Sequence, residues 1–438
     1  MSAIVLAVSM LCLRMGDVPA ASRTAQSPDS WLVLYNLNVP DSVVWAQWYR
    51  SQRRIPPPNL LGLNASPDEH LPDAAAAEAQ IIGPVRAFLA AEAEVSARVM
   101  GIVLGYGLPG HYGTPPYGVG GYSIACALQN PANLSFAVNP GCSHTFGDVL
   151  PPGGRLTKAT LTPGHFMVAR IDAPSLENAK ALTTRAKAAW LSRSVMPGQW
   201  ICYDYSDSIM PNGEWFWLKM AVLSPNLRGL SWRSYDEDTE QTPQDAFRFG
   251  THDTKNWDNH RLRGAPAGPR ILAYDLNSWG ATTVRSTTAE GGRFVPNAID
   301  AGYAAAIGST GEPSTTTAPY PDTLLEALLA GWTLGEAFYL SNPYDGFMWT
   351  LVGDPFLRVP DWSPPPVTVE QDFDRDGDID LLDFTAFFAC VRGPGQICPE
   401  GCERKDLDGD GDVDLVDFSR FSSCYNGPNG APAAGCQD

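Results

Sequence analysis

The residues with the clearest chemical meaning are aspartates near the C-terminus. They form two groups, and the second repeats the first with an offset of 34 residues at every position (406 − 372 = 34). A twelve-residue calcium loop uses side-chain oxygens at positions 1, 3, 5 and 9, a backbone carbonyl at position 7 and a carboxylate at position 12. The pattern therefore predicts two calcium sites, with ligand residues Asp372, Asp374, Asp376, Asp378, Asp380 and Asp383 in the first loop and Asp406, Asp408, Asp410, Asp412, Asp414 and Asp417 in the second.

Other residues of the repeat support this interpretation over that of a solvated acidic run. Gly377 and Gly411 occupy position 6, where a calcium loop turns sharply, and Ile379 and Val413 occupy position 8, from which they can pair the two loops. So many carboxylates repel one another unless a divalent cation neutralises them. We therefore expect calcium binding to be coupled to folding of this segment.

Short helices are expected after both loops. Phe384, Phe387 and Phe388 follow the first loop, and Phe418 and Phe421 follow the second, at helical spacing. A loop followed by one helix, repeated once, resembles the type I dockerin over about residues 369–425. Dockerins are duplicated calcium modules of secreted bacterial proteins, so the resemblance implies Ca²⁺ at two sites and a module that tethers the rest of the chain.

The two loops depart from the usual calcium loop at position 12 and from the dockerin pattern at positions 10 and 11. Position 12 is Asp in both loops, where Glu is usual in calcium loops. Positions 10 and 11 are Leu381-Leu382 and Leu415-Val416, whereas cellulosomal dockerins carry polar residues there to contact cohesin. The second departure argues against cohesin as the partner and leaves another protein partner or a cell-surface component.

The composition and the linker signals divide the chain into a large and a small unit. At 438 residues with 44% hydrophobic and 18% charged residues, the chain can bury a sizeable core. We expect a signal peptide at 1–21, an α/β domain at 30–360 with a Gly/Pro-rich insertion at 107–160, a Pro-rich linker at 361–368 and the calcium module with a Cys-rich tail at 369–438. The apolar run at 3–13, followed by small residues, predicts export to an extracellular, cell-surface or periplasmic location.

Charge, hydropathy and cysteine content narrow the function classes. The net charge of −18 argues against nucleic acid or an anionic membrane as a partner. No stretch after the signal is long and apolar enough to span a bilayer. Removing Cys12 leaves an even number of cysteines, which in an exported protein are disulfide candidates. Cys126 and Cys142 can close one loop, and Cys390, Cys398, Cys402, Cys424 and Cys436 cluster in the tail.

The large unit alternates strand and helix patterns. Apolar runs at 31–35, 99–106, 166–170, 270–275 and 304–308 predict strands, and the spacing at 175–192 and 324–340 predicts helices. A helical pattern at 73–98 is interrupted by Gly83-Pro84. This alternation predicts an α/β fold with a mostly parallel sheet flanked by helices, followed by the small α-helical module.

Several segments of the large unit together resemble an uncharacterised family of exported bacterial proteins that is similar to gingipain and caspase-like cysteine peptidases. They are 38–42 with 54–56, 84–88, 101–109, 169–172, 331–337 and 353–355. The resemblance implies a catalytic His and Cys after two neighbouring strands. Those places hold Leu276–Gly280 and Ser309–Pro313, without His or Cys, so the sequence does not support an active cysteine peptidase. Ser309 is interpreted as a loop or helix-capping serine.

Weaker groupings leave other chemistry open. His252, Asp253, Asp258 and His260 form a polar cluster of metal or acid–base type, although histidines so spaced are more often on the surface. A carboxylate pair for glycoside hydrolysis would come from Asp204 and Asp207, or from Glu214 with Asp236 and Glu237. Two hypotheses follow: a binding or linking protein anchored by the calcium module, or an extracellular hydrolase acting on polysaccharide or protein. The dockerin resemblance favours polysaccharide as the substrate of such a hydrolase.

Overall fold

The structure is a computed structural model of the whole chain. The residues that it describes are 24–113, 121–133, 137–142, 155–191, 200–204, 232–235, 245–250, 270–276, 278–288, 293–313, 317–359, 371, 373, 379, 381–396, 398–399 and 402–425. The predicted signal peptide at 1–21 and linker at 361–368 lie outside this part of the chain.

The described residues of the large unit form a sheet of ten strands. The strands outside the C-terminal unit are β1 (Trp31–Asn36), β2 (Leu60–Leu63), β3 (His70–Leu71), β4 (Gly101–Leu104), β5 (His111–Tyr112), β6 (Tyr122–Ser123), β7 (Ala137–Val138), β8 (Met167–Arg170), β9 (Trp200–Asp204), β10 (Trp232–Tyr235), β11 (Asp245–Gly250), β12 (Arg270–Asp275), β13 (Tyr303–Ser309), β14 (Tyr344–Asp345) and β15 (Trp349–Gly353). The large sheet has the order β10-β9-β11-β12-β13-β15-β8-β4-β1-β2. Small sheets pair β7 with β14 and β5 with β3 and β6.

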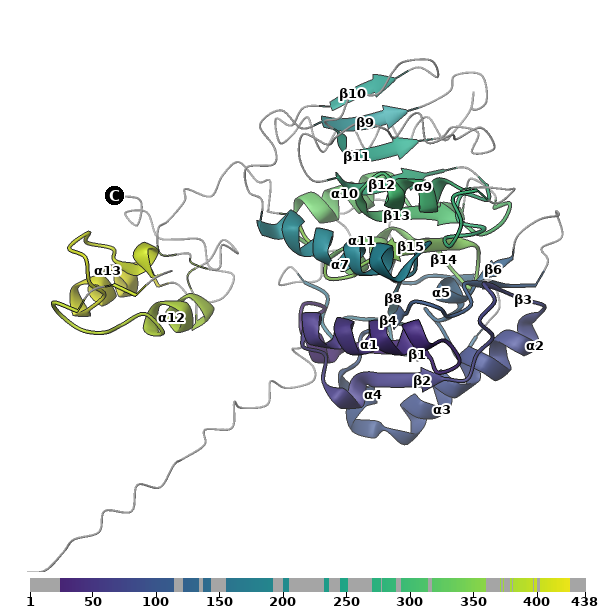
Figure 1. Ribbon diagram of the computed structural model, residues 1–438, viewed down its shortest axis with the longest axis horizontal. Coiled ribbons are helices and arrows are strands. Elements are labelled where there is room, and N and C mark those ends of the chain that lie inside the picture. The colour runs from purple at the N-terminus through teal and green to yellow at the C-terminus, as the bar shows by residue number, and fades with distance from the viewer. Residues whose placement is uncertain are drawn as a thin grey trace, which may run out of the picture.

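Helices flank this sheet and also form the C-terminal unit (Figure 1). They are α1 (Pro40–Arg53), α2 (Ala74–Ala77), a π-helical turn (Glu78–Ile82), α3 (Gly83–Ala91), α4 (Ala93–Arg98), α5 (Ile124–Ala127), α7 (Leu176–Leu191), α9 (Phe294–Asp300), α10 (Pro321–Leu329), α11 (Leu334–Ser341), α12 (Leu381–Phe388) and α13 (Leu415–Cys424). The predicted α/β class is therefore confirmed, with a small helical region after it.

The pairing makes the sheet mostly parallel. β1 runs parallel to β2 and β4, β4 to β8, and β12 to β11 and β13, whereas β15 runs antiparallel to β13. Parallel strands are covered on both faces and so consist of continuous apolar runs. The fully buried pattern of β4, β8, β12 and β13 fits this rule. The residues that follow β4, β8 and β12 lie together, because Arg285 donates to Asp172 and to Leu108 O. We call this side of the sheet the carboxyl edge.

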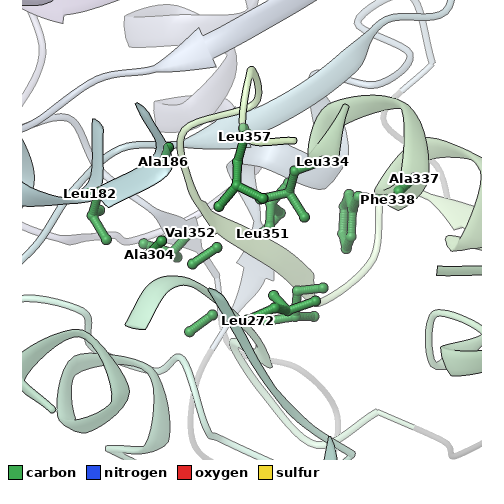
Figure 2. Packing of buried hydrophobic residues seen from close by; sticks show 14 of the residues in the cluster. Leu182, Ala186, Leu272, Ala304, Leu334, Ala337, Phe338, Leu351, Val352 and Leu357 are labelled. Carbon is green, nitrogen blue, oxygen red and sulfur yellow. The ribbon is translucent and has the colours of Figure 1, made fainter. Parts of the chain in front are cut away.

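The core lies between the sheet and its helices. α7 contributes Leu182 and Ala186, and β12 and β15 contribute Leu272 and Leu351, all buried in one apolar cluster. Figure 2 shows these side chains from close by, with Leu334 of α11 beside Leu357. Burial of such side chains stabilises the fold by about 1.5–3 kcal/mol each, before the entropy cost of ordering the chain.

Two helix boundaries differ from the prediction. Gly83-Pro84 does not interrupt the helix: Gly83 N–H bonds to Glu78 O through a π-type turn, and Pro84 falls in the first turn of α3, where its missing N–H costs little. The pattern at 324–340 is two helices rather than one. Gly331, at φ +77°, follows α10 in a left-handed conformation that glycine adopts readily, and α11 begins after Thr333.

The sequence pattern missed several elements. Strands β10 and β11 lie in the polar, aromatic region 231–262, for which no strand is predicted, and α9 precedes β13. The Gly/Pro-rich segment 107–160 holds the short elements β5, β6, α5 and β7 among its described residues. The sequence also predicts a helix near 214–222, and this segment lies outside the described residues. In the described part of the chain, no helix combines the length and the hydropathy needed to span a membrane.

Candidate metal centre and the carboxyl edge of the sheet

The second aspartate loop is closed by its first and last carboxylates. Asp406 Oδ1 accepts the N–H of Gly409 at 2.7 Å and its Oδ2 accepts the N–H of Gly411 at 2.9 Å. Asp417 Oδ1 accepts the N–H of Leu407 at 2.6 Å, and its Oδ2 accepts that of Asp414 at 2.7 Å. These bonds fold residues 406–417 into a compact loop whose carboxylates face inward at both ends.

Two groups of carboxylates converge inside this loop. Oxygens of Asp406, Asp408 and Asp410 lie within 4.8 Å of one another, and so do oxygens of Asp412, Asp414 and Asp417. Gly411 adopts φ +95°, which lets the backbone turn back at position 6 as predicted. Carboxylate oxygens at this spacing are ligands for hard cations. Each group has the oxygen spacing of a metal site, and a single ion bound by the loop can draw ligands from both groups.

The electrostatics of the loop also favour a cation. Desolvation, together with the negative charges of Asp410 and Asp417, raises the pKa of Asp408 above its ordinary value. A hydrogen bond from the N–H of Asp410 and the positive charge of Arg420 act in the opposite direction. Asp410 and Asp417 thus oppose the ionisation of Asp408. A divalent cation among them would remove this repulsion.

The described residues of the first loop repeat one contact of the second. Phe373 N–H donates to Asp383 Oδ1 at 2.6 Å, which corresponds to the bond from Leu407 to Asp417. Ile379 and Val413, the residues at position 8, are both buried in one cluster. The other predicted ligands of this loop, Asp372, Asp374, Asp376, Asp378 and Asp380, lie outside the described residues.

An aromatic core holds the two helices of the C-terminal unit together. The rings of Phe387 in α12 and Phe421 in α13 stack with centroids 5.2 Å apart, and Phe373 stacks on Phe421 at 5.9 Å. α13 begins with a capping box between Asp414 and Asp417, and the Asp414 side chain also accepts the N–H of Val416 at 2.7 Å. The start of the helix and the second aspartate loop therefore share these aspartates, so that order in one supports order in the other.

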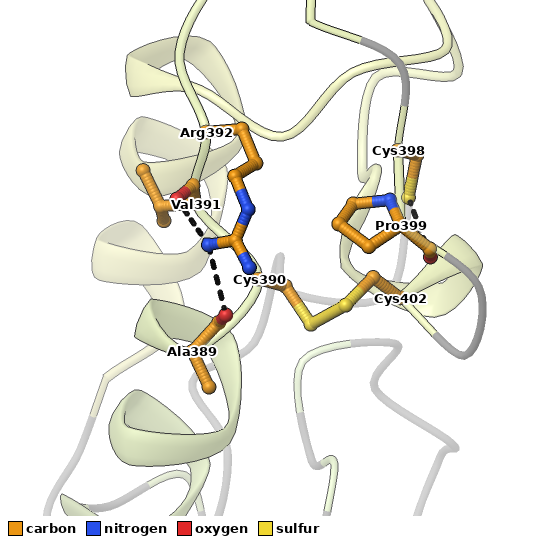
Figure 3. The surroundings of a disulfide bond; sticks show 7 residues. All are labelled: Ala389, Cys390, Val391, Arg392, Cys398, Pro399 and Cys402. Carbon is orange, nitrogen blue, oxygen red and sulfur yellow. Dashed lines mark hydrogen bonds between the residues drawn. A yellow bond between two sulfur atoms is a disulfide. The ribbon is translucent and has the colours of Figure 1, made fainter.

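A disulfide-closed segment braces the second loop. Cys390 and Cys402 form a disulfide across 12 residues, shown in Figure 3 with the Arg392 bonds to Ala389 and Val391. Within this segment, Cys398 N–H donates to Gly411 O at 3.0 Å. Gly395 N–H donates to the side chain of Asp412, and Arg392 N–H donates to Val413 O at 3.1 Å. The segment thus fixes the backbone at positions 6 to 8 of the loop.

Opening this disulfide is expected to weaken the second metal site. Without the disulfide, residues 390–402 gain chain entropy, worth about 3 kcal/mol for a loop of this size. Their N–H groups then no longer hold positions 6 to 8 of the second loop. A double variant, Cys390→Ser with Cys402→Ser, should lose about tenfold in affinity at the second site, measured by calcium titration of the full chain. The first site is the internal control. Unchanged affinity at the second site would show that the brace does not position it.

The predicted pairing of Cys126 with Cys142 is wrong, because both are free thiols. Cys126 is buried at the end of α5, where its sulfur accepts the N–H of Phe347 at 3.2 Å. Burial raises the pKa of Cys126 to about 12, so this thiol is not activated as a nucleophile. In the tail, Cys424 is also disulfide-bonded.

At the carboxyl edge, the loops after β12 and β13 are bonded to each other. Ser278 Oγ donates to Glu312 Oε1 at 2.5 Å, and Trp279 N–H donates to Gly311 O at 2.8 Å. Ser309 is fully buried, and its hydroxyl donates to Gly311 O at 3.1 Å. Ser309 is therefore a turn-forming serine, in agreement with the prediction from sequence.

A buried ion network lies at the same edge, and sequence reasoning missed it. Arg170, at the end of β8, donates to Asp172 Oδ2 at 2.6 Å and to Glu69 Oε1 at 2.8 Å. Arg285, after β12, donates to Asp172 Oδ2 at 2.8 Å and to Leu108 O at 2.5 Å. Two cations and two anions thus join loops that are far apart in sequence. The only sequence signal was Arg170 and Asp172 directly after an apolar run.

His111 belongs to this edge as a neutral imidazole. Its ring lies 4.9 Å from that of His70, and it is 4% exposed. Burial lowers the pKa of His111 to about 3, and the positive charges of Arg170, His70 and Arg285 add to the effect. Protonation of His111 is therefore not available for acid–base chemistry at neutral pH.

The network makes stability depend on pH through Glu69. Burial opposes ionisation of Glu69, but Arg170, Arg285 and two hydrogen bonds hold its pKa below the ordinary value of 4.5. A depressed pKa in the folded state gives stability that is present above 4.5 and is lost as the pH falls through the folded pKa. We expect Glu69→Gln to reduce this acid-side slope in urea unfolding followed by tryptophan fluorescence. Exposed Glu94→Gln is the control, and an unchanged slope in Glu69→Gln would contradict the assignment.

The weaker candidates receive no test from the described residues. His252, Asp253, Asp258 and His260 lie outside them, as do Asp207, Glu214, Asp236 and Glu237. Asp204 ends β9, but only the backbone of that strand is described. The proposed carboxylate pair and histidine cluster thus stay predictions from sequence.

Comparisons with known proteins add solved structures of similar shape. No family model and no curated protein matches this chain. One similar structure is a complex of Porphyromonas gingivalis RgpB pro- and mature domains, at 12% identity and TM-score 0.42, covering 76% of this chain and 80% of that chain. Another is the Arg specific cysteine proteinase gingipain R, at 11% identity and TM-score 0.43, covering 76% and 79%. The α/β class itself follows from the strand order and register described above.

Proposed function

We propose that this is an exported calcium-binding protein in which a dockerin-like C-terminal module anchors or links a large α/β domain that is not an active cysteine peptidase. The observation that supports the calcium part best is the closure of the second loop, in which Asp406 and Asp417 each accept backbone N–H groups from inside it. The hydrogen bond from the N–H of Phe373 to Asp383 repeats one of these contacts in the first loop and supports a second, equivalent site.

The donor set favours calcium over other cations. The loop offers carboxylate and carbonyl oxygens. It contains neither the sulfur nor the imidazole ligands that zinc and copper prefer. Six ligand positions with a carboxylate at position 12 match the higher coordination number of calcium. Magnesium requires a smaller octahedral site and keeps most of its waters.

Export is supported by the redox state of the tail. The Cys390–Cys402 disulfide and the disulfide of Cys424 are stable in oxidising compartments and rare in the cytosol. Together with the apolar run at 3–13, these disulfides support our proposal that the chain is exported.

The carboxyl edge supports a binding or structural role for the large domain. Ser309 is bonded into a turn, Cys126 is a buried thiol with a raised pKa, and His111 is neutral. Ser278 is bonded to the carboxylate of Glu312, which links the loops after β12 and β13. Ser309, Cys126 and His111 form no nucleophile–base pair with one another. The hydrolase hypothesis depends on residues outside the described part of the chain.

The surface of the module supports a partner other than cohesin. Leu381 and Leu382 are 63% and 61% exposed, and Leu415 and Val416 are 76% and 51% exposed. Contiguous exposed apolar side chains mark interaction sites, and each of these pairs consists of neighbouring residues at the start of a helix, α12 or α13. We propose that the module binds a protein or cell-surface partner of apolar character at these positions.

Thermal unfolding with and without calcium tests the proposal. In the full chain under oxidising conditions, calcium should raise the midpoint of the module's transition, because the ion binds only its folded state. All 13 tryptophans precede residue 363, so their fluorescence follows the large domain, whose transition should not move. Calorimetry detects both transitions, and magnesium is the control. A calcium effect equal to that of magnesium would contradict the proposal.

A further inference from the structure

A pocket of about 330 Å³ lies in the large domain, away from the carboxyl edge. Its lining comes from the end of α1, from α7, from the residue before α11 and from the segment after β15. The lining residues are Gln26, Arg53, Ala186, Lys187, Thr333, Phe356 and Arg358. Its volume is at the lower end of the range of small-molecule sites.

The polar side of the pocket is basic. Arg53, Lys187 and Arg358 all line it, and no carboxylate does among the described residues. Three cations at one pocket are unusual in a chain of net charge −18. Arginine presents a planar fork of N–H donors that matches carboxylate and phosphate oxygens. The lining therefore favours a ligand with an anionic oxygen group.

Buried contacts hold Arg53 in position before any ligand arrives. Its Nε donates to Asp354 Oδ2 at 2.9 Å, and Asp354 is fully buried. Tyr49 Oη at 3.3 Å and Phe356 N–H at 3.1 Å both donate to Asp354 Oδ1. The Arg53 side chain is 15% exposed, so part of it faces the pocket while its Nε stays bound to Asp354.

Ala186 and Phe356 form the apolar side of the pocket, and Gln26 and Thr333 complete the lining. Arg53 Cζ lies 5.3 Å from the ring centroid of Phe356, which is itself 5.6 Å from that of Trp31. Ala186 lies in the same wall, and Leu334 N–H donates to Leu357 O at 2.8 Å beneath it. Figure 2 shows Ala186, Leu334 and Leu357 in this part of the core. The aromatic wall can stack on a flat apolar group.

We propose that this pocket binds a small oxyanion, a carboxylate or phosphate, carried on an apolar body. The anionic group would contact Arg53, Lys187 and Arg358, and the apolar body would lie against Phe356. This site is independent of the calcium module and of its proposed role.

Calorimetric titration of the full chain with phenylphosphonate tests the proposal. EGTA in the buffer removes calcium, so that the result does not depend on the metal sites. We expect saturable binding at one site that weakens with ionic strength. Inorganic phosphate, which lacks the ring, should bind about tenfold more weakly, and benzyl alcohol, which lacks the charge, should not bind. Absence of saturable phenylphosphonate binding would overturn the proposal, and equal affinity for phosphate would overturn its apolar part.

Matched lysine variants on α7 locate the site. Lys187 lines the pocket, whereas Lys180 pairs with Glu177 at 2.8 Å elsewhere on the same helix. Lys187→Met should weaken phenylphosphonate binding by about tenfold, as expected for the loss of one charge contact. Lys180→Met should leave the affinity unchanged. Equal weakening in both variants would show a general charge effect and would overturn the assignment to this pocket.

Discussion

Replacing Asp417 by alanine is expected to abolish calcium binding at the second loop. The carboxylate at position 12 supplies ligand oxygens, and here it also accepts the N–H groups of Leu407, Asp408 and Asp414. Asp417→Ala removes both functions, so the loop loses a ligand and its closure together. We expect the affinity of this site to fall on the order of 100-fold or more in calcium titration of the full chain.

Asp383→Ala is the matched variant of the first loop. Asp383 accepts the N–H of Phe373 as Asp417 accepts that of Leu407, so this change should remove the first site by the same reasoning. Each single variant should therefore retain one bound calcium ion. Retention of two ions by Asp417→Ala would show that position 12 is not a ligand.

Replacing Asp172 by alanine is expected to cause the largest loss of stability in the large domain. Asp172 Oδ2 accepts hydrogen bonds from both Arg170 and Arg285, and neither Asp172 nor Arg170 is exposed. Removing it leaves buried positive charge without its partner, which typically costs 3–5 kcal/mol. Urea unfolding followed by tryptophan fluorescence measures this loss.

Asp68→Ala is the control for that measurement. Asp68 is exposed on the loop near Glu69, where its side chain contacts Ser66. Surface changes of this kind typically alter stability by less than about 0.5 kcal/mol. If Asp172→Ala were as mild as Asp68→Ala, the network would be a surface feature rather than the link between the loops after β8 and β12.

Much of the fold could be predicted because buried strands are local in sequence. The run Arg270–Asp275 predicts β12 with its observed bounds, and the helix expected at 175–192 is α7. The two wrongly predicted helix boundaries depend on the backbone conformation of single residues, which the spacing of apolar residues does not reveal. Gly331 ends α10 through its left-handed conformation, and Pro84 is tolerated because it falls in a first helical turn. Neither effect changes the apolar spacing.

The candidate sites also differ in how far apart their residues lie in the sequence, and therefore in how well the sequence predicts them. A calcium loop takes its ligands from twelve consecutive residues, so the spacing of the aspartates reveals it. The ion network at the carboxyl edge combines Glu69, Arg170, Asp172 and Arg285, which only the folding of the sheet brings together. The basic pocket also combines residues that are distant in sequence, since Arg53 and Arg358 lie near the two ends of the sequence of the large domain.

Counting the calcium ions bound by the full chain tests the central claim most directly. The oxidised protein is dialysed against buffered calcium, and bound metal is measured per chain, with the double variant Asp383→Ala and Asp417→Ala alongside. Two loops with the same twelve-residue pattern predict two ions for the natural chain and none for the double variant. Equal metal content in the two proteins would contradict the proposal that these loops are calcium sites.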